Sequence, residues 1–170
     1  MRQERREVRR EFRQERREQV ARVRAQQAYN DRLRAQQRYW STTRYNAYFN
    51  TPMTHRYAIG GRYYQTNRYG VDIIRQAAQH GYAEGVRAGQ ADRYDGWRYD
   101  YRDSWAYRDG GFGYHGRYID RQHYAHYFRE GFRRGYEDGY YGQGRYGRYD
   151  NRAGQYLMIG AILAAILNID

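Results

Sequence analysis

The feature that most constrains this chain is a glycine at every fourth position, three times over, in two segments that align at an offset of fifty residues. The six glycines are Gly81, Gly85, Gly89, Gly131, Gly135 and Gly139. In a helix, a period of four forms a ridge along one face. Glycine inside a helix costs about 1 kcal/mol relative to alanine, so each ridge needs a compensating contact. The pattern therefore predicts that another backbone approaches each glycine ridge closely.

An apolar ridge with the same period lies beside each glycine ridge. Its members are Ile74, Ala78, Tyr82 and Val86 in the first segment and Tyr124, Phe128, Phe132, Tyr136 and Tyr140 in the second. We predict that residues 73–93 and 123–143 form a packed pair of helices related by pseudo-twofold symmetry, in the manner of a glycine zipper. Small residues at this spacing also occur in membrane helices. Here Arg and Glu cover the other faces, so we expect neither helix to span a bilayer.

A turn signal precedes each glycine segment. The pair Gly60-Gly61 separates two short runs of β-forming residues, which predicts a hairpin with a two-residue turn. The pair His115-Gly116 repeats this turn before the second segment. The sequence therefore predicts a duplicated hairpin–helix unit.

The expected fold is mainly α, with a long charged N-terminal helix, the packed helix pair, short β-hairpins and a short apolar C-terminal helix. Its parts are a charged helical arm at 1–40, a core at 41–150 with copies at about 56–93 and 112–143, and an apolar helix at 151–170.

The arm has neither Gly nor Pro and is dominated by Glu, Arg, Gln and Ala, which is typical of a long solvated helix. Its apolar residues are too sparse for a continuous heptad seam. Five glutamates at spacings of three and four stack on one face between Arg ridges: Glu4, Glu7, Glu11, Glu15 and Glu18. This stripe is either a solvated face or a surface on which an Arg ridge of a second helix docks.

The basic residues are all Arg, 31 of them against 19 acidic residues, and the net charge is +12. Arg pairs bidentately with phosphate or carboxylate and stacks on rings. Ten Arg-Tyr dipeptides place the two side by side, and five of six hexads between residues 38 and 73 open with one. This chemistry favours a polyanion, such as nucleic acid, acidic glycan or an anionic lipid surface. The candidate residues are Arg5, Arg6, Arg9, Arg10, Arg13, Arg16, Arg17, Arg44, Arg56, Arg62 and Arg68.

Catalytic signatures are missing. The chain has no Cys, which excludes disulfide scaffolds and thiolate chemistry, and no nucleophile elbow or phosphate-binding loop is present. His123, His126 and Glu130 share a helical face and form a candidate transition-metal site. We expect neither enzymatic activity nor a cofactor.

The only oily stretch runs from Tyr156 to Leu167 and is shorter than the roughly 20 residues of a membrane span. One interpretation is a core helix seated against the glycine ridges. The other is an exposed oligomerisation or membrane-surface helix. Its contact residues would be Leu157, Ile159, Gly160, Ile162, Leu163, Ala164, Ile166 and Leu167.

The string YFREGFRRGYEDGYYG at 127–142, together with AGQADR at 88–93, resembles a family of uncharacterised bacterial proteins rich in Tyr, Arg and Gly, many of them exported. The resemblance implies a periplasmic, cell-envelope or extracellular location and no particular activity. The apolar stretch of a signal peptide does not follow Met1 in the chain as given.

The sequence thus favours a non-enzymatic structural protein of the bacterial envelope or exterior, a homo-oligomer held by Gly-ridge helices, Arg-Tyr contacts and the apolar tail. The alternative is an Arg- and Tyr-based module that binds a polyanion. The two differ in their response to salt, because polyanion affinity falls steeply with ionic strength whereas apolar packing does not.

Overall fold

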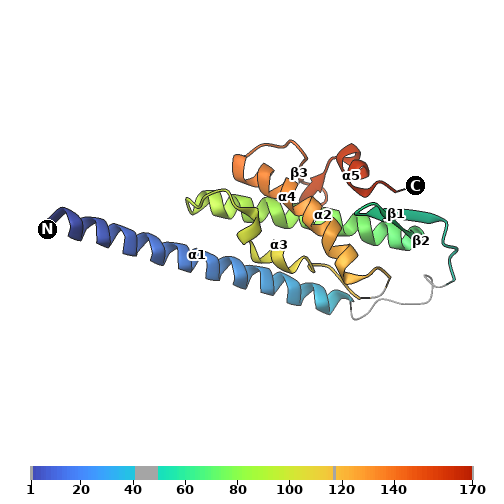
Figure 1. Cartoon of the computed structure of the whole chain (residues 1–170), viewed down its shortest axis with the longest axis horizontal. Helices are drawn as coiled ribbons and strands as arrows, with labels where there is room; N and C mark the ends of the chain where they lie inside the picture. The colour runs from blue at the N-terminus through green and yellow to red at the C-terminus, as the bar shows by residue number, and fades with distance from the viewer. Residues whose placement is uncertain (1, 41–49, 117, 170) are drawn as a thin grey trace.

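Figure 1 shows the computed structural model of the chain, which describes residues 2–40, 50–116 and 118–169. The fold is mainly helical with two short antiparallel hairpins, which confirms the expected class. The elements in chain order are α1 (Arg2–Trp40), β1 (His55–Ile59), β2 (Arg62–Thr66), α2 (Arg68–Tyr94), the 3-10 helix η1 (Tyr101–Asp103), α3 (Trp105–Asp109), α4 (Arg121–Tyr141), β3 (Gly147–Asp150), β4 (Gln155–Met158) and α5 (Gly160–Leu167).

The helices α2 and α4 form the centre of the molecule, with α1 and α5 on opposite sides of the pair (Figure 1). A Cβ built at Gly81 would lie 1.9 Å from the carbonyl oxygen of Phe128, and one at Gly131 would lie 1.9 Å from that of Ala78. These two contacts are related by the offset of fifty residues. The other four glycines repeat the contact at 2.0 to 2.3 Å.

These contacts define the geometry of the pair. Each glycine ridge faces the backbone of the partner's apolar ridge, and the contacts advance along both helices in the same direction, so α2 and α4 are parallel. Each glycine Cα–H points at a carbonyl oxygen, the arrangement of a weak C–H···O bond. The packed, pseudo-symmetric pair that the glycine spacing predicts is therefore present.

Tyrosine supplies the four largest fully buried side chains of the core, and the hydroxyl group of each finds an acceptor. Tyr82 donates to the Asp138 carboxylate (2.9 Å) and Tyr127 donates to the carbonyl of Ala58 (2.9 Å). The rings on α4 from Phe128 onward are stacked at successive separations of 6.1, 6.2 and 6.0 Å. Large aromatic surfaces are buried here without stranded polar groups.

Side-chain caps set where both central helices begin. The Asn67 side chain accepts from the backbone N–H groups of Tyr69 and Gly70 at the start of α2. Asp120 accepts from Gln122 at the start of α4. Both are residue types that satisfy the unpaired N–H groups of a first turn.

The first predicted hairpin is confirmed, and the second is wrong. In β1–β2, Ile59 pairs with Arg62 around a two-glycine turn in which both glycines have positive φ. Around His115-Gly116, the described residues form bends and no strand. Tyrosine hydroxyls occupy the backbone acceptors there, because Tyr124 donates to the carbonyl of Phe112 (2.7 Å) and Tyr114 donates to that of Ile119 (3.0 Å).

The region after α4 also differs from the expectation of one helix over 151–170. The second hairpin, β3–β4, occupies its start, and α5 begins only at Gly160. The Gln79 side chain holds β4 against α2, donating to the carbonyl of Tyr156 (2.6 Å) and accepting from the Met158 N–H (3.0 Å). These hydrogen bonds with a distant glutamine hold residues 155–158 as a strand, so the C-terminal helix begins after them.

The helix α5 packs on α2 and α4 with one face. Leu167 is buried, whereas Gly160 and Ala164 are exposed. Across the described ranges, no helix has the length and apolar character needed to cross a membrane.

Candidate functional site

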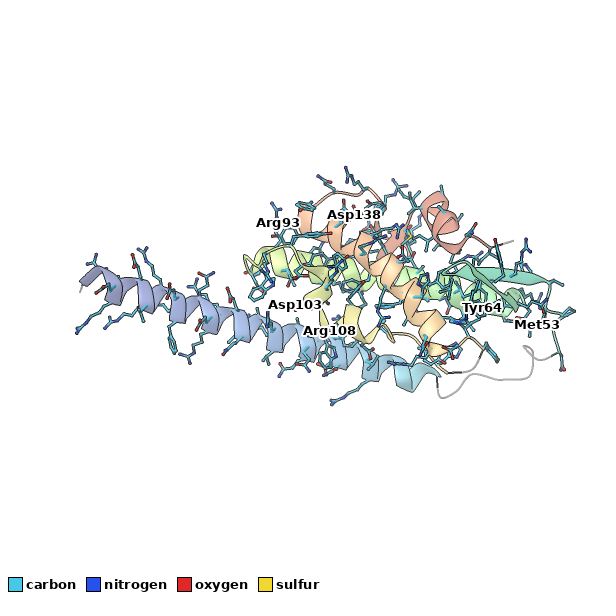
Figure 2. The ribbon with its side chains drawn as sticks, viewed as in Figure 1. Met53, Tyr64, Arg93, Asp103, Arg108 and Asp138 are labelled. Carbon is cyan, nitrogen blue, oxygen red and sulfur yellow. The ribbon has the colours of Figure 1, made fainter. Side chains whose placement is uncertain are left out.

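The arm α1 divides into a docked half and a projecting half. Its C-terminal half lies along α3 and α2, and its N-terminal half extends beyond every other element (Figure 1). Figure 2 shows the side chains of the projecting half pointing away from the helix on all sides. Residues 4–17 are all exposed.

A buried carboxylate fixes the docked half. Glu84 of α2 is 1% exposed, and the Arg32 guanidinium of α1 grips it with Nε at 3.0 Å and Nη2 at 2.5 Å. Arg87 adds a third hydrogen bond at 2.8 Å. A buried carboxylate without such partners would be strongly destabilising, so this contact holds α1 on α2.

Tyr29 is the only α1 residue that the described structure buries fully, at 2% exposure. Its hydroxyl donates to the Asp109 carboxylate (2.7 Å), and its ring lies 5.8 Å from that of Phe112. Burial, followed by the hydrogen bond to Asp109, raises the pKa of Tyr29 far above its usual value. The residue therefore remains a neutral donor.

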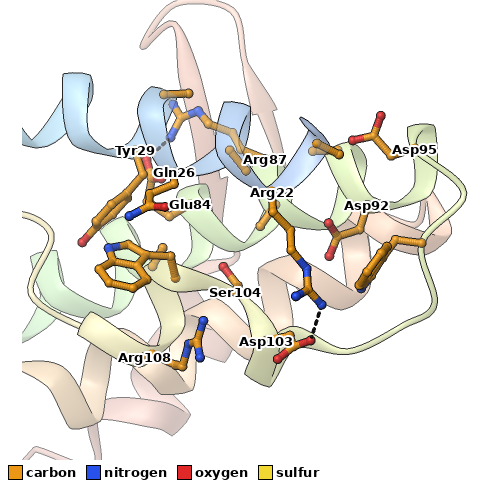
Figure 3. A pocket seen from close by; sticks show the side chains of 18 of the residues that line it. Arg22, Gln26, Tyr29, Glu84, Arg87, Asp92, Asp95, Asp103, Ser104 and Arg108 are labelled. Carbon is orange, nitrogen blue, oxygen red and sulfur yellow. Dashed lines mark hydrogen bonds and ion pairs between the residues drawn. The ribbon is translucent and has the colours of Figure 1, made fainter. Parts of the chain in front are cut away.

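A cleft of about 390 Å³ lies between α1, α2 and residues 97–108 (Figure 3). At its rim, Arg22 lies 4.6 Å from the centre of the Trp97 ring and 3.2 Å from the Asp103 carboxylate. Small side chains line both long walls and leave the space open: Ala21, Ala25, Ala28, Ala88, Ala91 and Ala106.

The charged groups of the cleft are largely engaged with one another. Asp92 accepts the hydroxyl of Tyr136, and burial raises the pKa of its carboxyl group. Ser104 lines the cleft, but the neighbouring Asp103 pairs with Arg22 and does not serve as its base. The arrangement is suited to holding α1 in place.

The projecting half separates positive from negative charge. The Arg face consists of seven exposed residues, Arg5, Arg6, Arg9, Arg10, Arg13, Arg16 and Arg17. At 100° per residue they fall within an arc of about 140° along about 18 Å of helix. In the described chain, no hydrogen bond or ion pair joins these guanidinium groups to another residue.

The Glu face lies on the other side of the same helix. It consists of Glu4, Glu7, Glu11, Glu15 and Glu18. These residues fall within an arc of about 80°, and the centres of the two faces are about 170° apart. Val8 and Phe12, 62% and 64% exposed, lie along one boundary between the faces.

The remaining predicted Arg residues do not join this surface. Arg56 and Arg62 are exposed on β1 and β2 and Arg68 opens α2, at the end of the molecule opposite the arm tip (Figure 1). Arg44 lies outside the described residues. The predicted polyanion set is therefore divided between two distant places.

Adjacent Arg-Tyr pairs seldom stack on each other. Arg68 does lie over Tyr69, at 4.8 Å from its ring centre. Arg102 lies over the preceding Tyr101 (5.5 Å), and other Arg residues use more distant rings, as Arg56 does with Tyr63 across the hairpin (4.9 Å). The dipeptides contribute to folding more than to a shared surface.

The candidate metal site is not assembled. Across the described ranges, no group of three His, Cys, Asp or Glu residues is placed to hold a metal ion. Glu130 is paired with Arg133 (3.2 Å) and Arg134 (2.7 Å), and His123 Nδ1 hydrogen-bonds the Tyr57 hydroxyl (2.8 Å). These partners occupy the side-chain atoms of Glu130 and His123 that would have to bind the metal ion.

The predicted packing residues lie inside the chain's own core. All six ridge glycines meet the partner helix, and Phe128, Phe132 and Tyr136 are fully buried. The tail residues are divided: Leu167 is buried, Ile159, Gly160 and Ala164 are exposed, and the rest are half-buried, namely Leu157, Ile162, Leu163 and Ile166.

Sequence reasoning missed the residues that dock the arm. Glu84 offered a signal, because it is a carboxylate between two glycines of a ridge predicted to be buried, and such a group needs an Arg partner. Trp105 is 47% exposed and lines the cleft.

Comparison of the chain with protein-family models, curated proteins and solved structures finds no match.

Proposed function

We propose that this protein is a non-enzymatic binding protein whose α1 arm holds an extended polyanion. The observation that carries the proposal is the Arg face, where seven exposed guanidinium groups lie on one side of a projecting helix with no acidic partner in the described chain. The docked half of α1 supplies the rigid attachment through Arg32 and Glu84.

Self-association through the glycine ridges, the sequence's first interpretation, has less support. The ridges are filled by α2 and α4 of the same chain, and most apolar side chains of the tail are at least half-buried on its own core. The arm is the main surface left for a partner. We retain the envelope or exterior as the proposed location, on the resemblance alone.

The length of the Arg face sets the size of the effect. About 18 Å of helix spans about five phosphates of one DNA strand at 3.4 Å each, so log affinity should fall with log salt at a slope of about −4.5. Raising the salt from 50 to 200 mM should therefore weaken binding about 500-fold.

The test compares two variants of equal charge. The Arg-face variant replaces four Arg residues of the arm by Gln: Arg6, Arg10, Arg13 and Arg17. The control makes the same change at four exposed Arg residues outside the arm: Arg75, Arg98, Arg148 and Arg152. Gln keeps the helix propensity of Arg. Binding of a labelled DNA duplex, a sulfated glycan and anionic vesicles is measured by anisotropy or co-sedimentation across salt concentrations.

The Arg-face variant should lose affinity, with the salt slope reduced by about one per lost phosphate contact, while the control keeps both. Equal losses in the two variants would mean that net charge alone attracts the polyanion, and the proposal would be wrong. Binding to vesicles without binding to the DNA duplex or to the glycan would assign the Arg face to lipid headgroups.

A further inference from the structure

We infer that the Glu face of α1 is a docking surface for the Arg face of a second copy, so that arms associate side by side, head to tail, in an open row. This inference goes beyond the proposed function, since it adds the Glu face and a second copy of the chain as the partner; the contact occupies the Arg face of that copy, for which a polyanion would compete. Its basis is charge complementarity between the Arg face and the central part of the Glu face, Glu7, Glu11 and Glu15, for which the described chain supplies no ion pair.

The three central residues of the Glu face, Glu7, Glu11 and Glu15, are exposed and have no ion-pair partner in the described chain. Each has another glutamate three or four residues further along, an unfavourable arrangement for a lone helix, and only Glu7 has an Arg at such a spacing, Arg10 at i+3. A row of guanidinium groups spaced along a helix is the complementary surface, and the Arg face of this chain has the same length.

The core determines the orientation of the second arm. Arg22, Tyr29 and Arg32 continue the helical face of the glutamates, and they contact the core. A parallel helix on the Glu face would therefore collide with the core beyond residue 18. An antiparallel helix runs away past the arm tip instead, and its own core lies on the side away from its Arg face.

The angle between the faces determines the form of the assembly. A two-fold dimer would bring like faces together, Arg against Arg or Glu against Glu. The complementary contact is heterologous, and because the faces are about 170° apart, each added copy leaves one face open and the row does not close.

Ionic strength sets where the contact can be seen. At about 0.1 M salt the screening length is about 10 Å, close to the diameter of one helix. Contacting faces then still attract, while the net charge of +12 on each chain is largely screened beyond them. Association should be weak, dependent on concentration and abolished at about 1 M salt.

The test uses two variants that each lack one face. The Glu-face variant carries Glu7, Glu11 and Glu15→Gln, and the Arg-face variant is the one defined above. Full-length chains are compared by analytical ultracentrifugation at about 0.1 M salt, near the screening length argued above. Circular dichroism and melting check that both variants, changed only at exposed residues, keep the fold.

The wild type should form a concentration-dependent series of sizes, and each variant alone should remain a monomer. An equal mixture should form a 1:1 complex and stop there, because the Glu-face variant still offers an Arg face and the Arg-face variant still offers a Glu face. Association of either variant alone, a monomeric mixture, or a wild type that stays monomeric at high concentration would each overturn the inference.

The same variants separate this inference from the proposed function. The Glu-face variant should lose self-association but bind a polyanion at least as tightly as the wild type, because a repulsive surface is gone. The Arg-face variant should lose polyanion binding as well as self-association, so it does not separate the two. The contact between arms is then tested by the equal mixture of the two variants.

Discussion

The replacement Gly135→Ala tests whether the close approach of α2 and α4 holds the fold together. The new Cβ would lie 2.0 Å from the carbonyl oxygen of Tyr82, whereas ordinary contacts of this kind begin at 3.4 Å. The nearest atoms of Tyr82 all belong to its backbone, so no change of side-chain rotamer relieves the clash. The helices must separate locally by the difference, about 1.4 Å.

The magnitude follows from what lies at that interface. Six of the large side chains on the two apolar ridges are almost fully buried, and each contributes about 1.5–3 kcal/mol to stability by its burial. A gap of this size forfeits about a quarter or more of the contact energy, or about 3 kcal/mol in all. Alanine returns about 1 kcal/mol through its helix propensity. The net loss is about 2 kcal/mol, a fall in Tm of about 5 °C.

The matched control is Gly160→Ala, at the start of α5, where a Cβ meets nothing within 4 Å. Its Tm should stay level or rise slightly. Thermal unfolding followed by circular dichroism compares the three proteins. If Gly135→Ala melts at or above the wild-type temperature, glycine contact is not what holds the helix pair, and the packing argument is refuted.

Two further predictions concern the arm joint and pH. Arg32→Ala removes one partner of the buried Glu84 and should lower stability by about 1–3 kcal/mol, with faster tryptic cleavage in α1. Arg24→Ala, at an exposed site, is the control. Equal rates of tryptic cleavage in the two variants would contradict the role of Arg32 in docking α1. Burial, together with the charge of Arg87, lowers the pKa of His80 to about 4. The unfolded chain then binds more protons between pH 6.5 and 4, so stability should fall by about 3 kcal/mol as the pH drops through that window. His80→Gln should flatten the fall measured by denaturant unfolding, and an unchanged profile would exclude His80 as its source.

The sequence predicts the helix pair because its signal is local and its cost is known. Three glycines within one helix need a contact, and an equal period in a second segment identifies the partner. The direction of the pair was not predictable, because a ridge with a period of four is the same when read either way. It follows from the long connection between Tyr94 and Arg121, which allows α4 to start at the same end as α2.

The missed features depend on contacts between distant residues. The strand β4 relies on the side chain of Gln79, and the expected hairpin at His115-Gly116 is replaced by backbone acceptors bound to tyrosine hydroxyls. A two-residue turn signal is a local preference, and these tertiary hydrogen bonds override it. The candidate metal site failed for one local and one distant reason, since Arg neighbours one turn away pair with Glu130 and the distant Tyr57 hydroxyl hydrogen-bonds His123.

The same amino acids satisfy one another in the core and not in the projecting half of the arm, and this contrast supports the arm as the proposed partner surface. In the core, Arg32 and Arg87 surround Glu84, and carboxylates that lack an Arg accept tyrosine hydroxyls, as Asp138 does from Tyr82. In the projecting half, the spacing collects Glu with Glu and Arg with Arg, so a lone helix gains few favourable pairs. A helix that is polar all round and has few such pairs gains little stability from its own side chains. The compact core completes its own interactions, whereas the projecting half leaves its charges exposed, which is why we propose that a partner binds there.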